Sequence, residues 1–347
     1  MGGVAGEHVA EERASDERFV LSRAVLPGYV ASTVGYGPTG ATQPIHRGLP
    51  SPYLTFILSL AGPVVTGMSE DEALGPAPDR TDIVLGGLAQ RPSYVVPDPE
   101  QRGVQLAVHP LAARALFGLP ARELLEVTDA TAVLGAGAER LRQRLAGSDD
   151  WTARFVLVRR YLRDRIDQRP AGRVRPEIAE AWRWLAWHRG NGSMAGLARH
   201  VALSPRQLGT LFSREVGVSP KKVSRLMRFD HAKQRLSHAV AAGGRPDLAE
   251  VAVACGYYDH AHLDRDFAQF VGVSPTAWLT EERRNIQAHG HRNGEDWLHG
   301  DHDARLADTR LPYPGAIDPG PIDPGPIDPG AIDRGAPAPG LGIPAGT

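Results

Sequence analysis

A chain of 347 residues is long enough for two ordinary domains, each with its own buried core. Its 39 basic and 40 acidic residues give a net charge of −1, which by itself favours no class of partner. One cysteine, Cys255, excludes a disulfide framework and a cysteine-based zinc cluster. The polar start of the sequence and the lack of a long apolar run indicate neither a secretory signal nor a membrane span, so we expect a cytoplasmic protein.

The N-terminal half of the sequence predicts strands first and helices after them. Short apolar runs bounded by glycine and proline predict strands at 53–60, 64–66, 82–88, 93–96 and 104–108. Helices are predicted at 110–117, 121–126, 138–145 and 151–166. The last of these has apolar residues at steps of three and four, so one face of it packs on a core or forms a dimer seam. The sequence has no phosphate-binding loop, Ser/His/Asp order or paired carboxylate motif, so we expect no enzyme.

Two later segments are predicted to lie outside the folded domains. Residues 167–176 contain two prolines, a glycine and three arginines, which is typical of a linker. Residues 285–347 are rich in Pro, Gly and Asp and repeat a five-residue unit such as GPIDP. One isoleucine per repeat buries too little apolar surface to offset chain entropy, so we expect a disordered tail. Its histidines have no metal-ligand spacing, and we expect neither a metal nor a cofactor in the protein.

The charge is distributed unevenly along the chain. Residues 173–280 carry 15 basic and 9 acidic side chains, a net charge of +6, whereas residues 281–347 carry a net charge of −5. All three lysines of the protein lie within 204–235. A local positive surface favours a polyanionic partner, although a solvated helix face can have the same composition.

The pentapeptide VGVSP ends two similar stretches, 204–220 and 259–275. Each stretch begins with an N-cap residue, carries an apolar stripe, and ends in glycine followed by Ser-Pro, a typical helix start. A short helix, at 194–201 or 248–255, and a tight turn precede each stretch, and a long helix over 220–238 joins the two units. A short helix, a tight turn and a second helix with outward polar residues is the helix-turn-helix pattern.

The second unit also resembles a known family. LAEVAVACGYYDHAHLDRDFAQFVGVSPTAW, at 248–278, is similar to the signature of the AraC/XylS family of transcriptional regulators. The resemblance implies an all-α double helix-turn-helix DNA-binding domain, which we place at 177–282, and sequence-specific DNA binding. The predicted fold class is therefore α+β. A mixed β-rich/α N-terminal sensing or dimerisation domain over 18–166 precedes the DNA-binding domain, and the disordered tail follows it.

The second helix of each unit is expected to enter the major groove. The side chains expected to contact bases are Arg206, Gln207, Thr210, His260, His262 and Arg265. The residues expected to contact the DNA backbone are Ser193, Arg214, Lys221, Lys222 and Arg225. Arg206 is the strongest base-reading candidate, because a guanidinium pairs bidentately with guanine. Gln207 either reads adenine or turns back to cap its own helix, and Thr210 stands where the family usually has arginine.

Three functions remain open at this point. The first is a transcription regulator controlled by a small-molecule effector bound to the N-terminal domain. The second is a regulator whose N-terminal domain only dimerises or binds a protein. The third is a DNA repair or modifying enzyme, which the lack of cysteine acceptors disfavours. The candidate partners are double-stranded DNA, an unknown effector, RNA polymerase and a second copy of the chain in a homodimer, and we expect no membrane partner.

Overall fold

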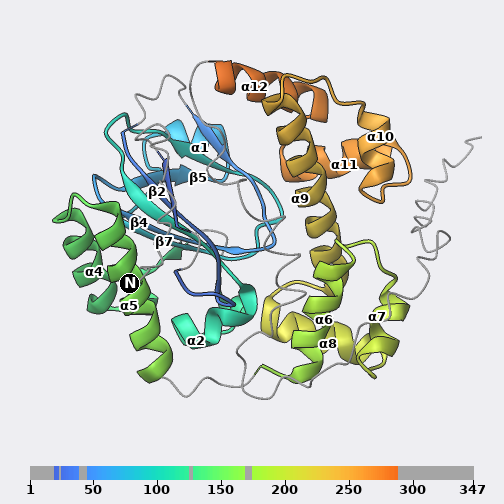
Figure 1. Ribbon diagram of the computed structural model, residues 1–347, viewed down its shortest axis with the longest axis horizontal. Helices are drawn as coiled ribbons and strands as arrows, with labels where there is room; N and C mark the ends of the chain where they lie inside the picture. The colour runs from blue at the N-terminus through green and yellow to red at the C-terminus, as the bar shows by residue number, and fades with distance from the viewer. Residues whose placement is uncertain (1–18, 23–24, 39–44, 125–127, 169–173, 288–347) are drawn as a thin grey trace, which may run out of the picture.

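The computed structural model describes residues 19–22, 25–38, 45–124, 128–168 and 174–287. Within these ranges the chain forms a β-rich region with several helices, followed by an all-helical region (Figure 1). This confirms the predicted α+β fold class for the described part of the chain. The predicted tail from residue 288 onward and residues 169–173 of the predicted linker lie outside the described residues.

The strands of the N-terminal region form two antiparallel sheets. The first sheet has six described strands, in the order β1 (Phe19–Ser22), β2 (Val30–Tyr36), β9 (Gly103–Val108), β4 (Leu54–Ser59), β7 (Ile83–Gly86) and β10 (Thr128–Asp129). The second has four, in the order β3 (His46–Gly48), β8 (Ser93–Val96), β5 (Val64–Gly67) and β6 (Asp79–Thr81). The five predicted strands are present as β4, β5, β7, β8 and β9, and the other five were not predicted.

Strands β4 and β9 lie at the centre of the first sheet because their inward side chains are apolar. Phe56 stands opposite Leu106 and Leu58 opposite Val104, and none of the four has exposed surface. Side chains at every second position of a strand share a face, so this register directs all four into one core.

The N-terminal region also contains helices around its sheets. They are α1 (Glu70–Leu74), α2 (Ala113–Phe117), α3 (Thr131–Leu134), α4 (Ala136–Ala146) and α5 (Trp151–Gln168), with 3-10 turns at Pro110–Ala112 and Ala121–Glu123. The helix predicted at 121–126 is therefore wrong in type, because Pro120 lies before the turn and Leu124 returns to extended backbone after three residues.

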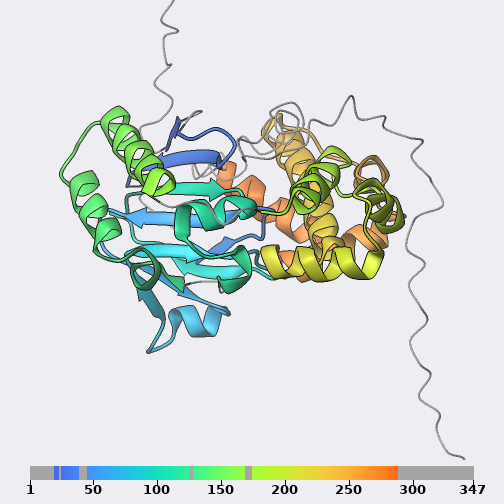
Figure 2. The ribbon, with the colours of Figure 1, turned by 90° about the horizontal axis from the view of Figure 1, so that it is seen from below.

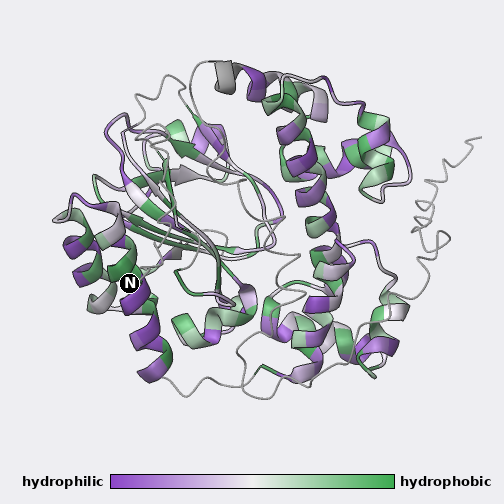
Figure 3. Cartoon of the chain, viewed as in Figure 1, coloured by the Kyte–Doolittle hydropathy of each residue, from purple (hydrophilic) through white to green (hydrophobic). Residues whose placement is uncertain are grey.

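Helix α5 packs on the first sheet. Gly35 of β2 has no side chain, and the Trp151 ring fills the space that a Cβ would need. Val158 and Leu162 are fully buried, so the apolar stripe of α5 packs on the core. Packing on a core was one of the two predictions for this stripe. The side of α5 that faces away from the core is mainly hydrophilic (Figure 3).

The C-terminal region is helical throughout its described residues. Its helices are α6 (Pro176–Trp187), α7 (Met194–His200), α8 (Pro205–Val216), α9 (Pro220–Ala241), α10 (Leu248–Ala254), α11 (His260–Phe270) and α12 (Pro275–Gln287). Helix α12 extends five residues beyond the predicted domain end at 282, so the first residues of the predicted tail are helical. Figure 2 shows the sheets between α4 and α5 on one side and these helices on the other.

Two hydrophobic clusters stabilise the described structure. The first is continuous from the N-terminal sheets through α6, α7 and α8 into the start of α9. Trp182 of α6 joins its two parts, with its ring centroid 5.1 Å from that of His109 and 6.2 Å from that of Phe212. The second cluster contains the rest of α9 with α10, α11 and α12. The buried core therefore does not divide at the predicted linker.

Candidate nucleic-acid interface

Two helix-turn-helix units lie at opposite ends of α9 (Figure 1). We call α7, its turn and α8 the first unit, and α10, its turn and α11 the second unit. Helix α9 spans 22 residues and carries buried side chains along much of its length, so it connects the units through packed contacts.

The turn of the first unit bends sharply at Ala202, whose φ of +53° is unusual for a residue with a side chain. Ser204 then caps α8, and its Oγ accepts a hydrogen bond from the Gln207 N–H. The Gln207 side chain in turn accepts from the Ser204 N–H at 3.1 Å, which completes a capping box. In this structure Gln207 therefore turns back to its own helix start, one of the two roles considered for it.

Helix α8 has one apolar face and one polar face. Leu208 and Phe212 are buried in the first cluster. Arg206, Thr210 and Arg214 are all exposed on the opposite side, at steps of four residues. The structure therefore brings these three predicted DNA contacts together on one accessible surface.

The second unit repeats this design with acidic caps. Asp247 caps α10, and Asp259 caps α11 by accepting the His262 N–H at 2.7 Å. Gly256 provides the positive φ of the turn, at +79°. Leu263 is fully buried below α11. The helix thus has a fixed start and a fixed inner face.

The predicted base contacts of α11 differ in exposure. His260 and Arg265 are exposed, and His260 Nε2 lies 3.2 Å from the Asp264 carboxylate. His262 is partly buried, with its ring edge-to-face against Tyr257 at 5.1 Å. Burial, together with the nearby Arg228 charge, lowers the pKa of His262. A neutral imidazole of this kind can donate or accept one hydrogen bond at a base edge.

The predicted backbone contacts gather near the start of α9, with one exception. Lys221 and Lys222 are exposed in the first turn, where the Ser219 hydroxyl accepts the Lys222 N–H. Arg225, by contrast, donates to the Asp266 carboxylate at 2.6 Å and to Gln269 at 2.9 Å. These bonds tie α9 to α11, a structural role that its sequence position did not indicate.

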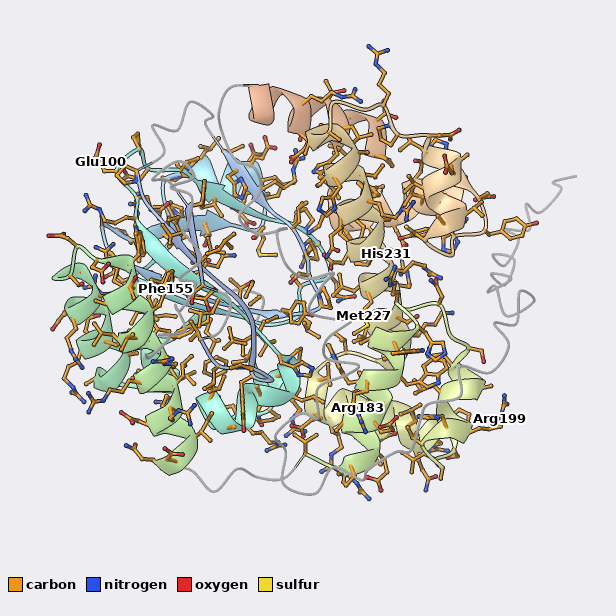
Figure 4. The ribbon with its side chains drawn as sticks, viewed as in Figure 1. Glu100, Phe155, Arg183, Arg199, Met227 and His231 are labelled. Atoms are coloured by element: carbon orange, nitrogen blue, oxygen red, sulfur yellow. The ribbon has the colours of Figure 1, made fainter. Side chains whose placement is uncertain are left out.

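Ser193 is also engaged in the structure, because its hydroxyl caps α7 and accepts the Gly196 N–H at 3.0 Å. On the same helix, Arg199 extends away from the rest of the molecule (Figure 4). Its exposure makes Arg199 a further candidate phosphate contact.

Tyr258 is a candidate that the sequence did not single out. It lies in the turn before α11 and is 69% exposed, while its neighbour Tyr257 is 3% exposed. An exposed phenol next to a recognition helix can donate to a phosphate. The Tyr-Tyr pair in the turn was the only sequence sign of it, and the sequence did not show which ring would be buried.

Cys255 ends α10 without any exposed surface. Burial raises the pKa of its thiol to about 11. Because the thiolate is the nucleophilic form, this cysteine is a poor acceptor for group transfer. Among the described residues, no group of three or more His, Cys, Asp or Glu side chains is arranged to hold a metal.

The two N-terminal sheets line most of a partly open cavity of about 130 Å³. Apolar side chains on the face of the first sheet opposite Phe56 and Leu106 line it on one side, among them Val34, Ile57 and Val84. His46, Arg91 and Lys233 also line it, and no carboxylate of the described residues does. Lys233 comes from α9, so the cavity wall includes one residue of the helix that joins the two units.

Comparison with known proteins identifies the helical region. A family of helix-turn-helix domains matches residues 197–281. The arabinose operon regulatory protein of Escherichia coli (strain K12) is 31% identical over 112 residues, which are 31% of this chain and 37% of that protein. A helix-turn-helix-type transcriptional regulator of Mycobacterium tuberculosis is 30% identical over 92 residues, which are 25% and 34% of the two chains. The matches thus span little more than a third of each relative.

Among solved structures, ToxT from Vibrio cholerae O395 aligns with a TM-score of 0.40 at 11% identity, over 68% of this chain and 95% of ToxT. A second ToxT structure aligns with a TM-score of 0.41 at 10% identity, over 76% and 98% of the two chains. None of the described helices in the present chain is both long enough and apolar enough to cross a membrane.

Proposed function

We propose that this chain, whose residues 197–281 form an AraC-type helix-turn-helix domain, is a sequence-specific DNA-binding regulator of transcription. The observation that carries the proposal is the pairing of two capped recognition helices, α8 and α11, each with a buried inner face and a polar outer face. Each unit presents its second helix to a separate stretch of major groove. The cytoplasm is the location that fits this function.

In the first unit, Arg206 reads a base and Thr210 contacts a neighbouring one. Arg206 is exposed at the start of α8, the end that enters the groove, and its guanidinium fits the O6 and N7 atoms of guanine. Thr210, one turn further along, offers a methyl group to thymine. In the second unit, the proposed base contacts of α11 are His260, His262 and Arg265, and Arg265 takes the place that Thr210 has on α8.

Phosphate contacts set the affinity and the register of the complex. Lys221 and Lys222 are the first choices, because both are exposed at the start of α9 beside the first unit. Arg214, exposed in the last turn of α8, and Ser193, at the start of α7, are the other proposed phosphate contacts of that unit. Contacts of this kind add affinity for every sequence, and salt weakens them.

We further propose that the N-terminal region binds a small-molecule effector in its cavity. An engineered protein cavity of about 150 Å³ binds benzene, so a cavity of about 130 Å³ suits a molecule with one small ring. The three basic side chains in the lining favour a negatively charged or acceptor group on that molecule. RNA polymerase and a second copy of the chain are further proposed partners, which a regulator of this class would contact on DNA.

The two alternative functions, a repair enzyme and a regulator whose N-terminal region only dimerises, require different properties of Cys255 and of the cavity. A repair enzyme of the alkyl-accepting type needs a reactive cysteine, and Cys255 is buried with a raised pKa. A region that only dimerises would leave the cavity without a ligand. Thermal unfolding of the full chain with single-ring acids and their neutral analogues separates the last two cases. A rise in the unfolding temperature with an added acid, abolished by Val95→Trp in the cavity lining, supports an effector. A stable dimer whose unfolding temperature no added acid changes supports dimerisation alone.

DNA selection tests the main proposal. The purified full chain is incubated with a pool of random duplexes, and bound duplexes are recovered and sequenced over several rounds. We expect enrichment of one motif with two conserved blocks, one for each unit. Recovery of unrelated sequences after every round, with affinity set only by salt, would refute sequence-specific binding.

A further inference from the structure

The cavity and the second unit share a two-stranded wall. Strands β3 and β8 are antiparallel neighbours with three residue pairs: His46 with Val95, Arg47 with Tyr94, and Gly48 with Ser93. The first and last pairs line the cavity. Because successive side chains of a strand point to opposite faces, the middle pair points away from the cavity.

That outward pair reaches the second unit and the helix that follows it. Nη1 of Arg47 donates to Oε2 of Glu281 on α12 at 2.8 Å. The Tyr94 hydroxyl lies about 3.5 Å from the place where residue 272, a glycine, would carry a Cβ. The ribbon formed by β3 and β8 therefore contacts the turn after α11 and the middle of α12 on the face opposite the cavity.

Two further residues join the cavity to the same part of the molecule. Leu49 follows β3, lines the cavity, and packs against the second hydrophobic cluster. Lys233 lines the cavity from α9, where it is 3% exposed and its Nζ lies 3.3 Å from the Asp230 carboxylate. A molecule in the cavity would therefore touch residues that also contact the second unit or belong to α9.

The first unit is attached in a different way. Its core is continuous with that of the N-terminal region, and Trp182 packs between His109 and Phe212. The Arg114 guanidinium adds an ion pair with Glu215 of α8 at 2.7 Å. Separating this unit from the N-terminal region would expose buried apolar surface, whereas separating α11 and α12 from that region breaks mainly polar contacts and the packing of Leu49.

From this asymmetry we infer that the β3–β8 ribbon is a regulatory relay. A ligand that fills the cavity displaces the ribbon and Leu49, breaks the Arg47–Glu281 pair, and releases the second unit, while the first unit stays fixed to the N-terminal region. The inference deepens the proposed effector function, since it states how an occupied cavity changes DNA binding. The regulated quantity is the restraint that the N-terminal region places on α11 and α12, which stay packed on α9.

A tethered ring tests the relay without knowledge of the natural ligand. Ser93→Cys places a thiol in the cavity lining, and benzyl methanethiosulfonate adds a benzyl group that dithiothreitol removes. The readout is amide hydrogen exchange of the full chain. We expect labelling to raise exchange in α10–α12 by about fivefold, the factor that a partly exposed ion pair can supply, with no change in α6–α8.

Three controls complete the experiment. Treated wild-type protein shows whether Cys255 reacts, and Thr152→Cys places the same label on the exposed side of α5. Arg47→Ala should reproduce the exchange pattern without any label, while Arg114→Ala should leave α10–α12 unchanged. The relay is overturned if labelling raises amide hydrogen exchange equally in both units, or if it changes exchange in neither unit.

DNA binding distinguishes the relay from the function on which it rests. If wild-type protein selects no DNA sequence, the proposed function fails, whatever the exchange data show. If it selects a two-block site, the labelled Ser93→Cys protein should lose affinity for that site and keep its affinity for the first block alone. Unchanged affinity for both would refute the relay and leave the proposed function standing.

Discussion

Arg206 and Lys221 are both exposed and positively charged, but the proposed function gives them different positions relative to a bound duplex. Arg206 lies at the start of the recognition helix α8, and Lys221 lies at the start of the connecting helix α9. In the proposed complex the first position faces base edges and the second faces phosphates. Substitution of each residue by alanine should therefore change DNA binding in a different way.

Arg206→Ala should weaken binding to the selected site by about 1–3 kcal/mol and relax the base preference at one position. The reason is the loss of bidentate pairing with a guanine, which no neighbouring side chain of α8 can replace. Fluorescence anisotropy with the selected site and with single-base variants of it measures both effects.

Lys221→Ala is the matched control for that experiment. It should weaken binding to all sequences by a similar factor and lower the slope of log affinity against log salt by about one. If Arg206→Ala behaves in the same way, Arg206 is a phosphate contact and our assignment of its role is wrong.

Cys255 offers a second test at the level of one side chain. It has no exposed surface, and burial raises the pKa of its thiol to about 11. At neutral pH the native thiol should react with an aromatic disulfide reagent far more slowly than the same thiol in urea, because reaction requires a thiolate and access. Fast labelling of the native protein, followed by absorbance, would contradict the burial of this turn.

At the level of elements, the two turns differ at one equivalent position. Ala202 and Gly256 both follow the C-cap of the first helix of their unit, and both have positive φ, +53° and +79°. Glycine adopts this conformation without strain, whereas alanine meets a steric cost. The first unit therefore contains a strained turn that the second unit avoids.

Ala202→Gly should raise the free energy of unfolding by about 0.5–1 kcal/mol, since relief of strain outweighs the added freedom of the unfolded chain. Gly256→Ala should lower it by about 1 kcal/mol or more, and its new Cβ would also displace the Asn191 side chain. Urea unfolding followed by circular dichroism gives both values, and a destabilised Ala202→Gly variant would contradict the strain argument.

The elements also show what the sequence could and could not predict. The caps at Ser204 and Asp259 and the glycine ends made the two units predictable, because capping and turn chemistry act locally. Strands β3 and β6 escaped prediction because they are three residues long and polar, so only pairing with β8 and β5 creates them. The cavity lining was unpredictable for the same reason, since it combines distant strands with Lys233 of α9.

At the level of the whole molecule, the first hydrophobic cluster crosses from the N-terminal region into the first unit. Sequence composition places a linker at 167–176, yet the side chains on its two sides pack together. Long-range packing of this kind leaves no local mark in the sequence. A fragment that ends near residue 170 would expose the surface that Trp182 and Phe212 cover, so functional tests are best made on the full chain.

Trp182→Ala should lower the free energy of unfolding by about 3–5 kcal/mol, because it removes a large side chain that is 2% exposed between two aromatic rings. Trp187→Ala, at the 46% exposed end of the same helix, is the control and should change it little. Calorimetry of both variants is the measurement. An equal loss of unfolding free energy in both variants would mean that Trp182 does not join the N-terminal region to the first unit.

The central claim is that both units read one DNA site, and footprinting of the selected site tests it most directly. We predict two protected segments on one face of the duplex, with centres about one helical turn, or 10–10.5 base pairs, apart. Arg206→Ala should weaken protection of one segment and Arg265→Ala that of the other. A single protected segment that both substitutions weaken equally, or no protection at all, would contradict the account.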